Sequence, residues 1–245
     1  MSNPARAVVA QTRVELLLTM RRGESLLVSF LIPVGILVFF TKVDAVNTTL
    51  SHPVDFLVPG VLALAVMSTA MVSLGIATGF ERRYGVLKRL GSTPLSRTGL
   101  VVAKIVNVIA IEVLQATVIV ATGVALDWDP SGRIVPAVGL LLLGTIAFAG
   151  IGLLLAGTLR AEATLAAANA LFLVLLFLGG MAYPLAKLPG VLEEVARALP
   201  AAALSDSVRK VLTSTGTFPT RSFLVLLAWA VAAPLAAIRW FRWEE

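Results

Sequence analysis

Residues 80–97 read FERRYGVLKRLGSTPLSR and form a basic segment between two long apolar runs. Projected on a helix of about 3.6 residues per turn, the segment places apolar and polar side chains on opposite sides. The apolar side holds Val86, Leu87 and Leu90, and the polar side holds Glu81, Tyr84, Lys88 and Arg89. Gly91 and Pro94 then end the helix, because proline removes an N–H donor and glycine is favoured just past a helix end. The segment predicts a short amphipathic helix at a membrane face, with a polar side that another protein can bind.

The composition indicates an integral membrane protein. The chain has 245 residues, of which 58% are hydrophobic and 14% are charged, and its mean hydropathy is +0.93. Soluble domains average about 45–50% apolar and about 25% charged residues. No polar stretch is long enough to bury a core of its own, so we expect a single membrane domain. The net charge of +6 lies mostly beside apolar runs, which indicates contact with anionic lipid headgroups and not with nucleic acid.

Several kinds of chemistry are excluded by residue type. The chain has no cysteine, so it offers no disulfide, thiolate metal ligand or cysteine nucleophile. Its one histidine, His52, precedes Pro53 in a loop and is expected to be solvated. No GxxxxGK[ST] motif is present to bind the phosphates of ATP. We therefore predict no catalytic residue, no metal site and no cofactor on this chain.

The order of residues in 81–97 resembles the signature of ABC-2 type transporter permeases: an acidic residue, basic residues, Gly, aliphatics, then Thr-Pro-Leu-Ser. It is most similar to the daunorubicin-resistance type of drug, polyketide or lipid exporters. The resemblance implies that 81–97 is a coupling helix that docks into a separate ATPase subunit, which would hold the ATP and Mg. The coupling residues it implies are Glu81, Arg82, Arg83, Tyr84, Gly85, Leu87, Leu90 and Pro94. Arg83 departs from the pattern, which often has a second acidic residue there. The alternative is an inner loop that is basic only through the positive-inside rule.

Six apolar segments predict an all-α membrane domain over residues 25–245. A helix needs about 20 residues to cross a bilayer. The predicted spans are residues 25–41, 54–80, 100–126, 134–159, 163–182 and 222–238. Pro33 predicts a kink in the first span. The glycine-rich fourth span predicts close helix packing.

Residues 1–24 predict an amphipathic helix that lies in the membrane interface. One apolar face is formed by Ala5, Val9, Thr12, Leu16 and Met20, which recur at helical spacing. The alternative is a plain polar tail. An even number of spans puts both termini on one side, and that side receives most of the 20 Lys and Arg residues, Lys104 among them. This bias predicts that both termini are cytoplasmic, in a multi-pass protein of the cytoplasmic membrane.

The connection between the fifth and sixth spans predicts two short helices within residues 186–213. One apolar face is formed by Val191, Leu192, Val195 and Leu199. In the second piece Asp206 and Lys210 are spaced to pair at i,i+4, and Ser205 is a candidate cap. The family resemblance implies external helices that re-enter the outer leaflet, with Gly180, Pro184, Pro189, Pro200 and Arg209 in this region. The alternative is a surface loop with incidental helices.

Three polar residues within the spans are candidates for the transport path. Glu112 lies near the middle of the third span, Gln115 follows one turn later, and Asn169 lies in the fifth. A lone carboxylate in lipid is costly, so Glu112 must face a partner, a water-filled cavity or be protonated. Gln115 shares its helix face and could bond to it. Two roles stay open: part of the substrate path or dimer interface, or a structural glutamate bonded across helices.

The sequence leaves three functional classes. The first, which the resemblance implies, is the permease of an ATP-driven exporter of a hydrophobic drug, lipid or polyketide-like molecule. Such an exporter contains two permeases, identical or related, and two ATPase chains. The second is a secondary transporter or channel, which would typically show an inverted repeat. The third is a lipid-modifying membrane enzyme, which would need a cluster of acidic or histidine ligands. Neither feature is visible in the sequence.

Overall fold

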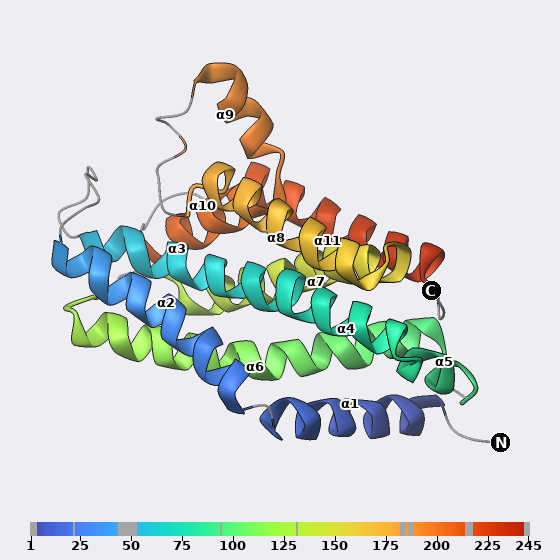
Figure 1. Ribbon diagram of the computed structural model, residues 1–245. Coiled ribbons are helices and arrows are strands. Elements are labelled where there is room, and N and C mark those ends of the chain that lie inside the picture. The colour runs from blue at the N-terminus through green and yellow to red at the C-terminus, as the bar shows by residue number, and fades with distance from the viewer. Residues whose placement is uncertain are drawn as a thin grey trace.

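The structure is a computed structural model that describes residues 4–21, 23–43, 53–93, 95–130, 132–181, 185, 189–213 and 218–242. These residues form a bundle of helices (Figure 1). In chain order the helices are α1 (Pro4–Arg21), α2 (Gly23–Val43), α3 (Pro53–Met67), the π-helical segment η1 (Ser68–Ser73), α4 (Leu74–Arg83), α5 (Val86–Gly91), α6 (Arg97–Ala125), α7 (Ile134–Thr158), α8 (Ala161–Leu178), α9 (Gly190–Arg197), α10 (Pro200–Thr213) and α11 (Thr220–Trp240).

Five helices of the described chain are long and apolar enough to cross a membrane. They are Pro53–Arg83, Arg97–Ala125, Ile134–Thr158, Ala161–Leu178 and Thr220–Trp240. The first of them is the continuous run α3–η1–α4. Helix α2 continues through Pro33 and adds a shorter apolar stretch, Ser29–Val43. The prediction of an all-α, polytopic membrane protein is confirmed, whereas the six-span arrangement stays a prediction.

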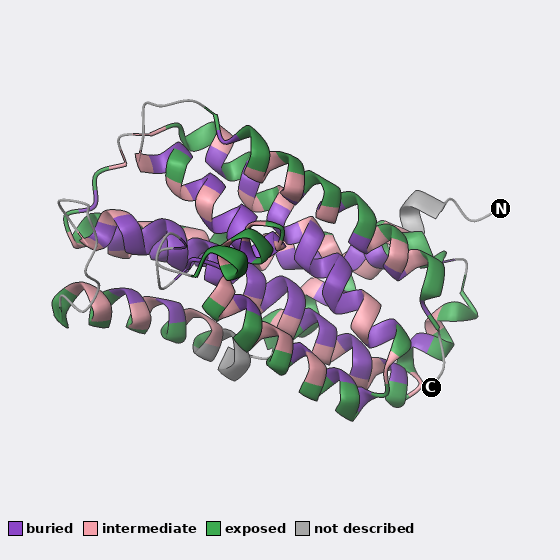
Figure 2. Cartoon of the chain, turned by 90° about the horizontal axis from the view of Figure 1, so that it is seen from above, coloured by how far each residue is buried: buried purple, intermediate pink, exposed green. Residues whose placement is uncertain are grey.

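Helix α7 lies in the middle of the bundle and contacts its neighbours through glycines. A Cβ on Gly152 would lie 2.5 Å from the carbonyl oxygen of Met71, and one on Gly150 would lie 2.5 Å from the nitrogen of Pro234. Such distances leave no room for a side chain, so α7 meets both η1 and α11 backbone to backbone. The close packing predicted from the glycines of this span is confirmed. Buried residues accordingly gather toward the middle of the bundle, and exposed ones lie on the outer helices (Figure 2).

The second span contains an irregularity that the apolar pattern does not predict. Over Ser68–Ser73 the helix widens to a π-helical turn. Within it Thr69 is buried, and its Oγ1 donates a hydrogen bond to Oε1 of Gln115 on α6 at 2.9 Å. Single π turns inside α-helices are frequent at functional sites. Hydropathy gives no sign of such a turn, because it depends on backbone register and not on side-chain polarity.

The basic segment is not the single helix over 81–97 that its periodicity predicts. Residues 81–83 are instead the end of α4, and the short helix α5 begins only at Val86. The two are separated at Gly85, whose φ of +70° is left-handed and is readily adopted by glycine. Helix α5 does end at Gly91, as predicted; Pro94 lies outside the described residues. The difference arises because a projection of polarity cannot detect one left-handed residue.

The connection before the last span also differs in detail from the prediction. Helix α9 projects from the bundle, whereas α10 lies within it, against α3, α7 and α11 (Figure 1). Ser205 is not a cap: it lies inside α10, is buried, and donates a hydrogen bond to the carbonyl of Gly179. Helix α10 begins at Pro200, because proline is well tolerated in the first turn of a helix. The predicted pair of Lys210 and Asp206 is present, at 2.9 Å.

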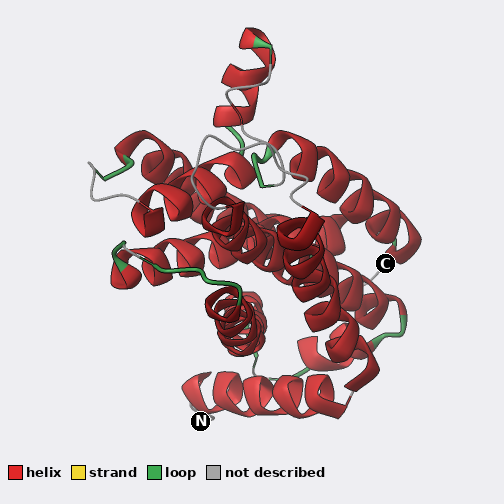
Figure 3. Cartoon of the chain, turned by 90° about the vertical axis from the view of Figure 1, so that its left-hand side faces the viewer, coloured by secondary structure: helices red, strands yellow, loops and turns green. Residues whose placement is uncertain are grey.

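Helix α1 packs on α6 and crosses beneath the other helices when the bundle is viewed toward one end (Figure 3). The amphipathic interfacial helix predicted for residues 1–24 stays a prediction, and burial within the chain does not follow its predicted apolar face. Val9 and Met20 are exposed, whereas the acidic Glu15 is buried. The most buried described side chain of this helix is therefore a charged one.

Candidate functional site

The turn between α4 and α5 forms an exposed projection at one end of the bundle. Tyr84 is 69% exposed and Val86 is 42% exposed, and both lie next to the left-handed Gly85. The rings of Tyr84 and Phe80 stack with centroids 6.1 Å apart. Lys88 and Arg89 are also exposed on α5. This surface, formed by Tyr84, Val86, Lys88 and Arg89, is called the α5 surface below.

Leu87 attaches α5 to the rest of the molecule. Its side chain is fully buried, while Leu90 is partly buried beside it. The small apolar cluster around it also contains Leu95, Leu100, Phe241 and Val8. These residues come from the start of α6, the end of the chain after α11, and α1. Helix α5 is thus anchored in an apolar cluster that also contains residues of three other segments.

Two arginines predicted to contact a partner are occupied within the chain. Arg82 is 4% exposed, and its Nη2 donates a hydrogen bond of 2.6 Å to the carbonyl oxygen of Leu159. Arg83 forms an ion pair with Glu162 at the start of α8. The end of the second span is thereby tied to the turn between α7 and α8. Arg82 is thus buried away from the surface, whereas Arg83 remains exposed on it; the sequence could not show which helix end lies opposite them.

A buried ionic cluster lies directly behind the basic segment. The Nζ of Lys104 is 2.7 Å from Oε2 of Glu81 and 2.9 Å from Oε1 of Glu15. Lys104 is 1% exposed. The three residues, called the Lys104 cluster below, join α6, α4 and α1. One turn further along α6, Nδ2 of Asn107 donates to Oγ1 of Thr19 at 3.3 Å and extends this contact along α1.

Lys104 and Glu15 are the residues that the sequence analysis missed. Lys104 was counted among the charges that set the orientation, although it lies within the third apolar helix. A lysine at that position requires a carboxylate partner. Glu15, a lone acidic residue in the otherwise basic and apolar helix α1, was the available signal.

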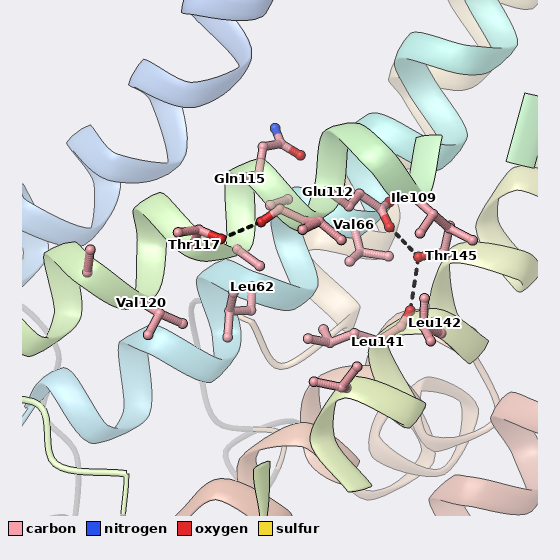
Figure 4. A pocket seen from close by; sticks show the side chains of 15 residues that line it. Leu62, Val66, Ile109, Glu112, Gln115, Thr117, Val120, Leu141, Leu142 and Thr145 are labelled. Carbon is pink, nitrogen blue, oxygen red and sulfur yellow. Dashed lines mark hydrogen bonds between the residues drawn. The ribbon is translucent and has the colours of Figure 1, made fainter. Parts of the chain in front are cut away.

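A lateral groove opens between α3, α6 and α7 and has a volume of about 610 Å³ (Figure 4). Its lining is almost entirely apolar. The lining residues are Leu62, Ala65, Val66, Ile109, Glu112, Val113, Gln115, Ala116, Thr117, Val120, Ala121, Val138, Leu141, Leu142 and Thr145. Pockets of about 300–1,000 Å³ with apolar walls and few polar groups typically bind small molecules. This groove is called the Glu112 groove below.

The structure brings Glu112 and Gln115 to the same groove but does not bond them to each other. Glu112 Oε2 accepts a hydrogen bond from Thr145 on α7. Gln115 Oε1 accepts from Thr69, and its Nε2 donates to the carbonyl oxygen of Ser29 on α2 at 2.9 Å. Asn169 is absent from the groove; it is exposed on α8 and donates to the carbonyl oxygen of Leu165 at 2.8 Å. Thr145 is 33 positions away in sequence, so helix spacing could not identify it.

The residues expected in the external region are partly brought together. Gly180 has a left-handed φ of +63°, and its carbonyl oxygen accepts a hydrogen bond of 2.9 Å from Nη2 of Arg209. The guanidinium carbon of Arg209 also lies 3.8 Å from the ring centroid of Phe56. Pro189 caps α9 and Pro200 begins α10, while Pro184 lies outside the described residues. Arg209 therefore links α10, α3 and the turn after α8.

Helix α9 is held to α11 at its ends and exposes its apolar face. Arg221 pairs with Glu194 at 2.8 Å, and the indole N–H of Trp229 donates to the carbonyl oxygen of Ala198 at 3.0 Å. The hydrogen bond from Arg221 lowers the pKa of Glu194. Val191 is 83% exposed. The apolar side predicted for this helix thus faces outward from the bundle.

Taken together, the long apolar helices and the attached basic projection define a polytopic membrane protein of the helical-bundle class. In the described part of the chain, no group of three or more His, Cys, Asp or Glu side chains is arranged to hold a metal ion. A family model described as ABC-2 type transporter matches residues 6–213. The chain belongs to the ABC-2 type transporter family, whose members are non-catalytic permease subunits that pair with ABC ATPase subunits.

A curated relative supports the same assignment. The chain is 25% identical over 232 residues to the Bacillus subtilis (strain 168) protein described as "Putative transport permease YvfS". The alignment covers 89% of this chain and 90% of that protein. The similarity therefore extends over nearly the whole length of both proteins.

Proposed function

We propose that this chain is the permease of an ATP-driven exporter of a hydrophobic drug, lipid or polyketide-like molecule across the cytoplasmic membrane. The observation that supports it is the family match over residues 6–213, which includes the basic segment. ATP and Mg belong to the partner ATPase. The export direction and the substrate class rest on the resemblance of 81–97 to the daunorubicin-resistance type.

The α5 surface is our proposed contact with the ATPase. Its exposed members, Tyr84 and Arg89, are available to a partner. The other predicted coupling residues act from inside: Leu87 attaches α5, and Gly85 allows the chain to turn between α4 and α5. Glu81 and Lys104 then connect this end to α6 and α1. In this proposal a movement of the ATPase is transmitted through α5 into the second and third spans.

A second permease copy, identical or related, is proposed to pack against α2 and α8. These helices carry strongly exposed apolar side chains, with Leu31 and Phe177 each 71% exposed. Asn169 lies on the exposed part of α8, where an amide in lipid would lack a partner for its oxygen. A water-filled path between the two copies, or a bond to the second copy, would supply one.

We propose six spans with both termini in the cytoplasm, with α1 at the inner face and α9 and α10 at the outer face. The chain contains no cysteine, so single cysteines report without background. Asp129→Cys in the α6–α7 turn should react with an impermeant maleimide in intact cells, and Ser92→Cys beside α5 should not. Labelling of Ser92→Cys from outside would contradict the orientation.

The direct test is purification of the tagged chain from its native membrane. We expect an ABC ATPase to co-purify, and the reconstituted complex to move daunorubicin or a fluorescent phospholipid only with ATP. Tyr84→Ala combined with Arg89→Glu should weaken this co-purification. Lys210→Glu, which changes an exposed cation on α10, is the matched control and should retain it. Transport by the chain without any ATPase would contradict the proposal.

A further inference from the structure

The Glu112 groove has its carboxyl group at one end. Glu112 lies near the middle of α6 and contacts Thr145 near the middle of α7. From there the groove extends toward Ala121 near the end of α6 and Val138 near the start of α7. The walls along that direction come from Leu62, Val120 and similar apolar residues. The groove therefore has a carboxyl group deep within the bundle and hydrocarbon walls toward the surface.

One oxygen of this carboxyl group has no partner in the described part of the chain. Oε2 of Glu112 is bonded to Thr145, whereas Oε1 is buried and accepts no hydrogen bond from any described residue. The hydroxyl of Thr145 also lies 3.0 Å from the carbonyl oxygen of Leu141. A hydroxyl has one proton, so Thr145 cannot serve a further acceptor. The site thus lacks a hydrogen-bond donor.

The neighbouring polar side chains of the described chain do not supply that donor. The Nε2 of Gln115 donates one of its two N–H groups to the carbonyl oxygen of Ser29 and forms no hydrogen bond with Glu112 among the described residues, and the hydroxyl of Thr117 donates to the carbonyl oxygen of Val113 at 2.8 Å. No lysine or arginine lines the groove. A buried acceptor without a donor is costly, and a buried charge without a counter-charge costs more. A ligand that carries both a donor and a positive charge would remove both deficits.

We propose that the Glu112 groove binds a hydrophobic primary amine, whose ammonium group donates a hydrogen bond to Oε1 of Glu112 while its apolar part fills the groove. The α3, α6 and α7 walls supply the apolar contact area, and the carboxyl group supplies orientation. This inference is separate from the proposed transport function, because it concerns binding to the permease chain by itself.

The order of polarity along the groove excludes a resident phospholipid. A phospholipid places its charged headgroup at the membrane surface and its chains toward the middle. In the groove the charged group is in the middle, and the surface end is lined by Ala121 and Val138. A phospholipid headgroup would find no polar partner there. An amine with an apolar tail fits in the opposite direction, with its head deep and its tail toward the surface.

Three probes share the same alkyl chain and differ in their head group. Dodecylamine carries a positive charge and N–H donors, dodecyltrimethylammonium carries a positive charge without a donor, and dodecanoate carries a negative charge. The full chain, in phosphatidylcholine nanodiscs, is labelled with a photoreactive dodecylamine, and each probe is used as a competitor. A charge-assisted hydrogen bond predicts that dodecylamine competes at a concentration about tenfold lower than the trimethylated probe, which has no N–H. Dodecanoate should compete least. Mass spectrometry should place the labelled peptides on α3, α6 and α7.

Variants connect the preference to the carboxyl group. Glu112→Leu removes both oxygens and should abolish the preference for dodecylamine over the trimethylated probe, while Glu112→Gln keeps an acceptor and should give an intermediate preference. Leu142→Trp should fill the groove and lower labelling by all probes. Glu162→Gln, an exposed carboxylate on α8, is the control and should leave the preference unchanged.

Equal competition by dodecylamine and its trimethylated form in the unmodified chain would overturn the proposal. An unchanged preference in Glu112→Leu, or in Glu112→Gln if the leucine variant fails to fold, would also overturn it. Labelled peptides that lie outside α3, α6 and α7 would likewise overturn the proposal. Because no ATPase is present, these outcomes are independent of whether the chain exports anything.

Discussion

Two buried ionisable residues on the same helix have opposite surroundings. Lys104 and Glu112 lie on one long helix, α6, and both are less than 10% exposed. Lys104 contacts two carboxylates from two other helices, whereas Glu112 contacts one hydroxyl and its other oxygen has no partner among the residues that the structure describes. Buried charges that are paired and hydrogen-bonded hold helices in a fixed arrangement. Buried charges without such partners are costly unless a ligand supplies the missing partner. If the proposed amine binds at Glu112, one helix combines a structural contact with a binding site.

The largest effect is expected from breaking the Lys104 cluster. Lys104→Met leaves Glu15 and Glu81 buried near each other without a cation, which should destabilise the protein by about 3–5 kcal/mol. Thermal unfolding and the yield of monodisperse protein measure this. The triple variant Lys104→Met, Glu15→Gln and Glu81→Gln removes all three charges and should recover part of the loss. If Lys104→Met alone were as stable as the unmodified chain, the Lys104 cluster would not contribute to the stability of the protein.

A smaller effect is expected at Arg209, a partly buried cation whose close contacts are a carbonyl oxygen and an aromatic ring. Arg209→Met loses the hydrogen bond to Gly180 and the contact with Phe56, and we expect a loss of about 2–3 kcal/mol in stability. Arg209→Lys keeps the charge but cannot reproduce the planar contact, so its stability should lie between that of Arg209→Met and that of the unmodified chain. Both variants are compared by thermal unfolding in the same detergent. Equal stability of the methionine variant and the unmodified chain would contradict this role.

At Glu112 the comparison predicts almost no loss of stability. In Glu112→Leu, an apolar side chain of similar size takes the place of a carboxyl group that has only one of its two oxygens hydrogen-bonded. Because the surrounding groove is apolar, the free energy of unfolding should change by no more than about 1 kcal/mol. Glu112→Gln should behave alike in yield and alter substrate-stimulated ATP hydrolysis by the reconstituted complex. A severe loss of folded protein in both variants would favour the structural role. Normal transport by both variants would count against a place in the path.

The smallest effect is expected for the exposed ion pair of Arg83 and Glu162. Their side chains are 45% and 61% exposed, and exposed pairs typically contribute about 0–1 kcal/mol. Arg83→Gln should therefore change the unfolding temperature little, and the difference should shrink further in high salt. If Arg83→Gln destabilised the protein as much as Lys104→Met, exposed and buried charge pairs would contribute equally to stability, contrary to this prediction.

The sequence predicted the helices well because apolar runs have lengths that match a bilayer crossing. The last span was expected at 222–238, and α11 covers Thr220–Trp240. The break at Gly85 and the π turn over Ser68–Ser73 were not predicted, since both depend on backbone angles that leave the polarity pattern unchanged. Segment periodicity therefore located the helices but not their irregularities.

The candidate sites were predicted only as far as contacts within one helix allow. Glu112 was identified because a carboxylate within an apolar span is conspicuous. Its bond to Thr145, and that of Lys104 to Glu15 across 89 positions, depend on how helices pack. A helix projection compares neighbours at three or four positions and contains no information about facing helices. Gln115 was for this reason matched with Glu112, although it bonds Thr69 and Ser29.

The glycine contacts of α7 limit which parts of the molecule can move. Gly150 and Gly152 bring α7 against the backbone of α11 on one side and of η1 on the other. A shift of α7 in register, by about 1.5 Å per residue, would replace a glycine at these contacts with a residue that has a Cβ. Sliding of α7 past either neighbour is thus sterically hindered at these two contacts. We therefore expect any change of shape to occur by rotation of other helices about α7, and not by sliding of α7 past η1 or α11.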